Sequence, residues 1–231
     1  MSIPRTIHHC WPGLDPFKKK YHDYRISWMR HNPYYDNFFF WTPENVPYNL
    51  MNPDSVRILK SQAHYCIKSD IMRWEVLRLF GGVITDTDVQ CLRCFDPLMK
   101  DKSFCARSYY DNDYGNAIVG SEPDNPMCQD IVTTLAQGIL ENWNDANSRN
   151  SFKYGVLMVV PFLARCEKIL SKETFYPFSW RDVAYKDKSK VHANYPDSYA
   201  IHWWCGGNSD GWVNDLKKKD QLGIVPPYPK K

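Results

Sequence analysis

The segment Ser69–Asp88, SDIMRWEVLRLFGGVITDTD, joins part of a predicted helix, a glycine pair and two closely spaced aspartates. Its apolar residues recur at spacings of three to four, which predicts a helix over about residues 62–80. Gly81 and Gly82 end this helix, as glycine does where the backbone must turn through a positive φ. The residues that make the apolar stripe are Ile67, Ile71, Trp74, Leu77 and Phe80.

Two aspartates, Asp86 and Asp88, lie in the strand predicted next, over residues 83–89. Residues two apart on a strand project to the same face, so both carboxylates are expected at one place. Like charges side by side repel each other unless a cation lies between them. Hard oxygen ligands suit Mg²⁺ or Mn²⁺, so the pattern predicts a divalent metal site. The alternative for a bare Asp-x-Asp triplet is a pair of surface aspartates at a strand end.

Asp70 and Arg73 are three residues apart on the predicted helix and therefore share a face. A carboxylate and a guanidinium held together suit sugar hydroxyls, which both donate and accept hydrogen bonds. The alternative is an ordinary surface ion pair, which contributes little.

Predicted strands and helices alternate along the rest of the chain, and no internal repeat is present. This order predicts a mixed α/β layered fold in a single domain over residues 1–231. The other predicted strands cover residues 3–11, 37–41, 117–119 and 199–204, and the other predicted helices cover residues 18–31, 128–143 and 156–170.

Composition restricts the class of protein. The chain has 231 residues, of which 43% are hydrophobic and 24% charged, as in a folded domain. A net charge of +3 gives no sign of a nucleic-acid partner. No signal peptide is predicted, because the first residues lack an apolar core region. No transmembrane segment is predicted either, because the longest apolar run, residues 156–164, is about half a membrane span. We therefore expect a cytoplasmic protein whose eight cysteines are reduced.

The segment Ser69–Asp88 resembles the DXD sugar-binding region of glycosyltransferase family 32. Further blocks resemble the same family in the same order: residues 3–11 (IPRTIHHCW), 94–98 (CFDPL), 116–121 (NAIVGS) and 199–204 (YAIHWW). The resemblance implies a GT-A fold, with a Rossmann-like mixed sheet flanked by helices. It also implies a metal-dependent, retaining transfer of a hexose-type sugar from a nucleotide sugar, as in polysaccharide biosynthesis.

The resemblance assigns roles to single residues. Asp86 would meet the ribose and the metal, and Asp88 the metal. Asp70 and Arg73 would hold the transferred sugar, so the catalytic set comprises these four residues. Trp11 would lie against the nucleobase, for which a flat indole is suited.

The resemblance also assigns further residues to the expected site. His202 would complete the metal or diphosphate site, and Trp204 or Trp212 could donate an indole N–H to a phosphate oxygen. His8 and Asn116 are also expected among the donor-binding residues. Taken alone, His202 is a buried core histidine and the tryptophans are packing residues.

Three features depart from the family pattern. Ile84 stands where relatives often carry an aromatic residue before the DXD. A later, TGP-like block of the family appears only as Lys153-Tyr154-Gly155-Val156, so the acceptor side departs from the family pattern. The loop over residues 206–212 is longer than expected and is a candidate flap over the donor.

Two other functions compete with glycosyl transfer. A non-catalytic carbohydrate-binding module would explain the 15% aromatic content but not the two same-face aspartates. A metal-dependent phosphotransferase would need a phosphate loop such as GxxxxGK[ST], which the sequence lacks. The resemblance to family 32 implies a nucleotide-sugar donor, UDP-linked in preference to GDP-mannose, and a glycan or glycoconjugate acceptor.

Retention is compatible with the sequence. An inverting enzyme needs a carboxylate placed as a base toward the acceptor. The acidic residues nearest the motif blocks are Asp96, Asp111, Asp113 and Asp210, and none lies in a pattern that marks a base.

Overall fold

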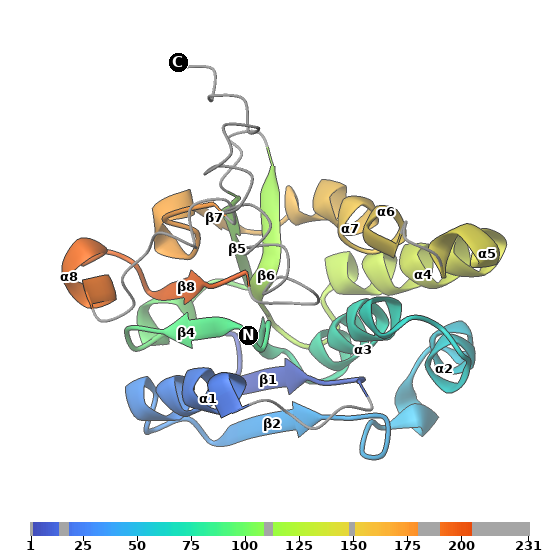
Figure 1. Cartoon of the computed structure of the whole chain (residues 1–231), viewed down its shortest axis with the longest axis horizontal. Coiled ribbons are helices and arrows are strands. Elements are labelled where there is room, and N and C mark those ends of the chain that lie inside the picture. The colour runs from blue at the N-terminus through green and yellow to red at the C-terminus, as the bar shows by residue number, and fades with distance from the viewer. Residues whose placement is uncertain (1, 14–18, 109–112, 148–150, 180–189, 205–231) are drawn as a thin grey trace, which may run out of the picture.

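A computed structural model describes residues 2–13, 19–108, 113–147, 151–179 and 190–204. Its centre is a six-stranded mixed sheet in the order β2-β1-β3-β6-β5-β7, and β4 pairs with β8 in a second small sheet (Figure 1). The strands are β1 (Thr6–Cys10), β2 (Asn37–Trp41), β3 (Gly82–Thr85), β4 (Val89–Cys91), β5 (Ser103–Arg107), β6 (Tyr114–Ser121), β7 (Lys168–Leu170) and β8 (Ala200–His202). The predicted mixed α/β architecture is confirmed.

The directions of the strands define the edge of the sheet at which a ligand is expected. β1 runs parallel to both β2 and β3, whereas β6 is antiparallel to β3 and β5. The carboxyl ends of the three parallel strands therefore meet at one edge, where open α/β sheets bind their ligands.

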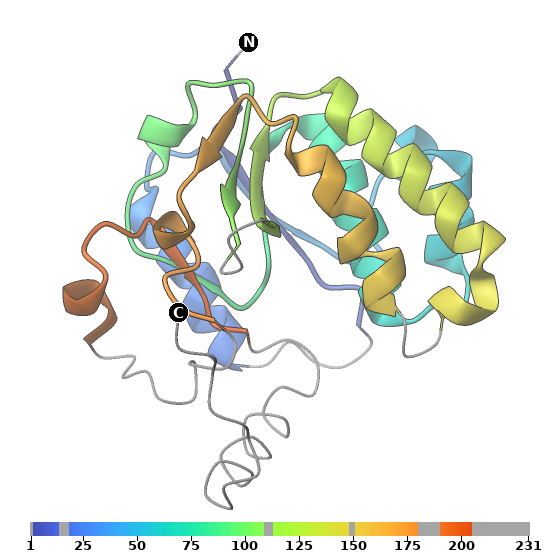
Figure 2. The same ribbon diagram turned by 90° about the horizontal axis from the view of Figure 1, so that it is seen from above.

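Helices cover both faces of the large sheet (Figures 1 and 2). One face carries α2, α3, α4 and α7 over a core that includes Cys10, Ile84 and Val119. The other face carries α1, whose Trp28 packs with Ile7 and Val83. The helices are α1 (Lys19–His31), α2 (Pro53–Lys60), α3 (Tyr65–Phe80), α4 (Pro126–Glu141), α5 (Trp143–Ala146), α6 (Ser151–Tyr154), α7 (Val156–Leu163) and α8 (Val191–Asn194).

The glycine stop after α3 is confirmed. Gly81 has φ 61° and Gly82 has φ 92°, a region that L side chains rarely adopt. A Cβ atom at Gly81 would also lie 2.6 Å from the backbone nitrogen of Pro123. Glycine is therefore required at this junction for both conformation and space.

The sequence predicts a single apolar stripe on α3, but the surroundings of this helix differ from that prediction. The helix is buried on most sides, and its buried residues include Asp70, Arg73 and Glu75. Glu75 accepts hydrogen bonds from Asn52 N and from the Arg78 guanidinium, so this carboxylate is internally satisfied. Asp70 and Arg73 are thus not an exposed surface pair.

Two other predicted elements are wrong in extent. The strand expected over residues 83–89 is interrupted, because β3 ends at Thr85 and a turn precedes β4. The helix expected over residues 156–170 ends with α7 at Leu163, and β7 occupies its last part. The sequence also gave no indication of α2 or β5.

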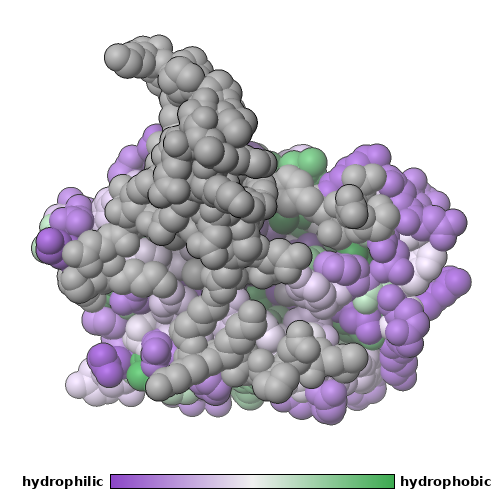
Figure 3. Space-filling model, in the orientation of Figure 1, coloured by the Kyte–Doolittle hydropathy of each residue, from purple (hydrophilic) through white to green (hydrophobic). Residues whose placement is uncertain are grey.

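The described surface is largely hydrophilic, and on the face shown in Figure 3 its hydrophobic residues form small separate spots. Within the described ranges, none of the helices combines the length and apolar character needed to cross a membrane. The seven described cysteines are free thiols.

Candidate glycosyl-transfer site

A turn, and not a strand, presents the two aspartates. The Asp86 amide donates to the Ala117 carbonyl of β6, 2.9 Å away. Val89 N closes the turn on the Asp86 carbonyl at 3.2 Å, and Trp203 N donates to the Asp88 carbonyl at 2.9 Å. The expected convergence of the carboxylates is present, but its cause is a turn held between β6 and the end of β8.

His202 joins these carboxylates from a distant part of the sequence. Pairing of β4 with β8 sets Val89 opposite His202, directly after the turn. The imidazole Nε2 lies 3.2 Å from Asp88 Oδ1 and 3.7 Å from Asp86 Oδ2. One ligand atom from each of the three residues lies within 4.8 Å of the others, which is compatible with a single ion.

The electrostatics of this cluster favour a cation. Burial raises the pKa of Asp86, because desolvation penalises the carboxylate. Burial alone would lower the pKa of His202, but the adjacent Asp88 carboxylate outweighs it and the pKa is raised. The cluster therefore favours positive charge between its carboxylates. A divalent ion held by two carboxylates and one imidazole meets this requirement, so the donor set fits such a metal.

Arg73 belongs to the same cluster. Its guanidinium contacts Asp86 Oδ1 at 2.5 Å and reaches the Ala117 carbonyl at 3.5 Å. Among the described ion pairs it is Asp86, not Asp70, that Arg73 meets. Burial raises the pKa of Asp70 to about 7, although the nearby Arg73 opposes the shift. The predicted Asp70/Arg73 pair is therefore part of a larger buried network.

Trp11 and Asn116 lie at the carboxyl edge of the sheet, one just after β1 and the other on β6 next to Ala117. Trp11 directly follows β1, and its ring lies 5.7 Å from that of Tyr21. Asn116 precedes Ala117 on β6, and its Nδ2 is buried without a hydrogen-bond partner. A buried donor without a partner costs stability unless a ligand or water completes it. Their donor-binding roles remain predictions.

The contacts of His8 contradict its predicted place among the residues that bind the nucleotide-sugar donor. Its Nε2 donates to the Gly81 carbonyl at 2.8 Å, and Trp41 Nε1 donates to its Nδ1 at 2.9 Å. Both ring nitrogens are thus used inside the protein, and burial lowers the pKa of His8 to about 4. The side chain is fully buried, so it supports the β1–α3 junction and leaves no group for the donor.

Trp204 also differs from expectation. Its ring lies 4.1 Å from that of His202, and its Nε1 donates to the Phe178 carbonyl at 3.4 Å. In this arrangement the indole packs against a predicted metal ligand and its N–H is directed to the protein. Trp212 and the loop over residues 206–212 lie outside the described residues.

Tyr176 is a site residue that sequence reasoning missed. Its buried ring meets His202 edge-on at 6.0 Å, and its hydroxyl accepts from Ile118 N at 3.3 Å. Gly115 leaves the space for this ring, since a Cβ atom there would lie 2.3 Å from it. No motif marks this tyrosine, because its role depends on contacts with β6 and β8.

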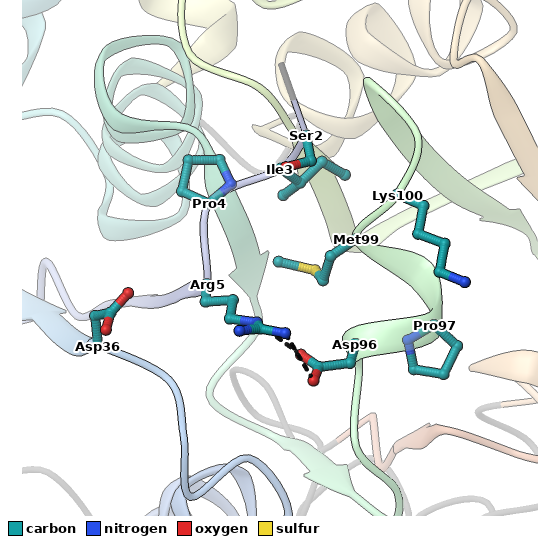
Figure 4. Close-up of a pocket in the computed structure, with 9 residues that line it drawn as sticks. All are labelled: Ser2, Ile3, Pro4, Arg5, Asp36, Asp96, Pro97, Met99 and Lys100. Atoms are coloured by element: carbon teal, nitrogen blue, oxygen red, sulfur yellow. Dashed lines mark hydrogen bonds and ion pairs between the residues drawn. The ribbon is translucent and has the colours of Figure 1, made fainter.

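A cleft lies at the opposite end of β1 (Figure 4). It encloses about 580 Å³ between the residues that precede β1 and the turn around Asp96. Arg5 and Asp96 face each other there through two hydrogen bonds of 3.1 Å. Its size alone does not make it the reaction site, because it lacks a convergent carboxylate–imidazole set.

Comparison with solved structures defines the class of fold. The PaToxG glycosyltransferase structure matches 100% of this chain and 81% of its own, with 14% identity and a TM-score of 0.58. The glycosyltransferase GlyE of Streptococcus pneumoniae matches 97% of this chain and 65% of its own, with 10% identity and a TM-score of 0.54. The fold is that of the GT-A glycosyltransferases, as the sequence resemblance implied.

Comparison of sequences defines the group more narrowly. Residues 18–105 match the family described as "Glycosyltransferase sugar-binding region containing DXD motif". The inositol phosphoceramide mannosyltransferase 1 of Schizosaccharomyces pombe is 26% identical over 59% of this chain and 44% of its own length. An uncharacterised glycosyltransferase of Acanthamoeba polyphaga mimivirus is 25% identical over 58% of this chain and 55% of its own length.

Residues 18–105 are thus similar to the DXD-containing glycosyltransferases, in agreement with the resemblance seen in the sequence. The matched segments span about half the length of these two relatives.

Proposed function

We propose that this chain is a metal-dependent, retaining glycosyltransferase. It transfers a hexose-type sugar from a nucleotide sugar to a glycan or glycoconjugate acceptor. The observation that carries the proposal is the convergence of Asp86, Asp88 and His202 within 4.8 Å. No structural need of the fold explains two carboxylates and an imidazole gathered at the carboxyl edge of the sheet.

Asp86, Asp88 and the Nε2 of His202 would hold the ion. When bound, a divalent cation supplies positive charge that stabilises the departing diphosphate. An imidazole ligand is less suited to Mg²⁺, which prefers oxygen alone, so the donor set favours Mn²⁺. Tyr176 and Trp204 confine the imidazole from two sides and so orient its Nε2 toward the carboxylates.

Arg73 and Asp70 would bind the transferred sugar. Asp86 and the Ala117 carbonyl fix one side of the Arg73 guanidinium, which leaves its remaining N–H groups for sugar hydroxyls. Asp70 is buried nearby and offers acceptor oxygens. A buried, preorganised pair can orient the sugar without reorganising during the reaction.

The positions of the other acidic residues support retention. Asp96 is paired with Arg5 at the opposite end of β1. Asp113 Oδ1 accepts from Tyr114 N at 3.0 Å and its carbonyl accepts from Ser108 N, so it stabilises its own loop. Asp111 and Asp210 lie outside the described residues. Proton NMR of the product soon after mixing tests retention, and an inverted anomeric signal would contradict it.

The donor can be found by a panel of nucleotide sugars. The Schizosaccharomyces pombe relatives named inositol phosphoceramide mannosyltransferases 1 and 3 make GDP-mannose one donor to test. UDP-sugars remain the preferred group. Thermal shift with and without Mn²⁺ reports binding, because a ligand that binds only the folded state raises the melting temperature. Release of nucleoside diphosphate then reports turnover. The absence of any Mn²⁺-dependent shift or release across the panel would overturn the proposal.

A further inference from the structure

An exposed ring pair begins α3, the helix that carries Asp70 and Arg73. His64 is the N-cap of this helix, and Tyr65 is its first residue. Their ring centroids lie 4.3 Å apart with planes 36° from parallel. Tyr65 is 45% exposed, although large apolar rings are mostly buried in this fold. This pair has no role in the metal cluster or in the core.

The ring pair lies at the rim of the proposed site. Helical rise is about 1.5 Å per residue, so Tyr65 precedes Asp70 by ~8 Å and Arg73 by ~12 Å along the axis. Burial raises the thiol pKa of Cys66, the next residue, and the Asp70 and Asp86 carboxylates lie close enough to raise this pKa further. Successive helical residues differ by about 100°, which places Tyr65 beside the pocket and not inside it.

Hydrogen bonds hold the backbone under these rings in place. His64 N donates to Asn147 Oδ1 at 2.5 Å, and Asn147 Nδ2 donates to the Gln62 carbonyl at 3.4 Å. His64 Nδ1 accepts from Cys66 N at 3.3 Å, as the side chain of an N-cap residue does. The segment before α3 is thus fixed to the region just after α5, and its rings are presented from a supported backbone.

We propose that His64 and Tyr65 form an acceptor platform on which a carbohydrate ring stacks against Tyr65. This inference rests on the proposed glycosyl transfer. A flat aromatic body with a polar tip suits the apolar face and the hydroxyls of a sugar. The Nε2–H of His64 and the exposed Gln62 amide supply hydrogen-bonding groups at its edge. The donor nucleobase is expected elsewhere, at Trp11 after β1, so the two ligands would use separate rings.

Steady-state kinetics of Tyr65→Ala and Tyr65→Phe test this platform, with p-nitrophenyl glycosides of common hexoses as acceptor probes. Donor hydrolysis without acceptor reports the donor site separately. We expect Tyr65→Ala to raise the acceptor KM about fivefold, equivalent to ~1 kcal/mol. Tyr65→Phe should stay within about twofold of the parent, because it keeps the ring. Donor KM and the hydrolysis rate should not change in either variant.

Tyr34→Ala is the matched control, because Tyr34 is 84% exposed and lies in the loop between α1 and β2. If the acceptor KM does not change in Tyr65→Ala, or changes as much in Tyr34→Ala, the platform proposal is wrong. The proposed donor site is not affected by that result. An equal rise in donor KM would assign Tyr65 to the donor instead. Turnover with lipid or peptide acceptors but with no glycoside would also overturn it. Loss of all hydrolysis in the parent protein would instead contradict the proposed function.

Discussion

Two Asp–Arg pairs lie at opposite ends of the parallel strands, and their surroundings differ. Arg73 and Asp86 meet at 2.5 Å with side chains 5% and 30% exposed. Arg5 and Asp96 meet at 3.1 Å with side chains 54% and 39% exposed. The first pair lies at the carboxyl edge beside Asp88 and His202, and the second borders the cleft at the amino end.

The difference supports placing the proposed reaction site at the carboxyl edge, because carboxylates outnumber their nearby guanidinium partner there and do not do so at the amino-end cleft. Arg5 satisfies Asp96 through two hydrogen bonds, and water screens both groups. Arg73 is one cation facing Asp86, with Asp70 and Asp88 close by in the same buried region. That excess of carboxylates is destabilising in the absence of a further cation, whereas binding of a metal removes the cost.

The strongest test of this contrast is Asp88→Ala. We expect it to lower turnover by at least about 10³-fold and to abolish metal-dependent donor binding, because it removes a proposed ligand. Asp96→Ala is the control and should retain activity. Enzyme assay, thermal shift with Mn²⁺ and circular dichroism check these outcomes. Full activity in a folded Asp88→Ala protein would contradict the metal site.

Arg73→Ala should give the next largest effect. It leaves Asp86 without its guanidinium partner, so we expect a loss of about 3 kcal/mol in the free energy of unfolding. Transfer should weaken far more than binding of free nucleoside diphosphate, because Arg73 is expected to touch the sugar. Urea denaturation measures the first quantity, and calorimetry with kinetics the second. Equal losses for diphosphate and nucleotide sugar would make Arg73 only a structural partner of Asp86.

Low pH should lower the stability of the fold through His8, which belongs to neither of the two Asp–Arg pairs. Burial lowers its pKa from 6.5 to about 4, so the folded state keeps the ring neutral. Below pH 6.5 the unfolded chain binds the proton first, and stability falls as the pH drops from 6.5 toward 4. The free energy of unfolding lost through protonation of His8 is about 3 kcal/mol. Above pH 6.5 this contribution is fully present.

Urea unfolding at a series of pH values measures this dependence. His8→Asn should be less stable at pH 7 but should show a shallower decline with acid, because the new side chain does not titrate. His22→Asn, at an exposed position of α1, is the control and should keep the parent slope. An identical slope in His8→Asn and in the parent would disprove the assignment.

Arg5→Ala should give the smallest effect. The pair is exposed, so we expect less than about 1 kcal/mol of lost stability and no change in turnover. The small loss should shrink further as salt rises, because ions screen exposed charges. A drop in kcat in this variant would show that the amino-end cleft takes part in the reaction, and it would remove the distinction between the two ends.

Local pattern predicted a large part of the fold. The apolar spacing and the glycine pair placed α3 and its end, and β1, α1 and β2 lie close to their predicted ranges. These elements depend on interactions between near neighbours, which sequence spacing records. The proline-interrupted apolar run was misread beyond Leu163, since a short apolar stretch fits a helix or a strand equally well. β7 forms there because β5 offers a parallel partner.

The chemical groups of the proposed site can be read from the sequence: two aspartates after a glycine stop, an aspartate and an arginine on the preceding helix, and a late histidine. How these groups combine follows from the tertiary structure. β4–β8 pairing brings His202 to the aspartates, the turn replaces the strand pleat, and Arg73 faces Asp86 instead of Asp70. The tertiary structure also excludes His8 from the donor-binding residues, because its two ring nitrogens hydrogen-bond to Trp41 and to the Gly81 carbonyl. Such contacts join residues far apart in the chain, and they follow from packing and strand register, which local spacing does not encode.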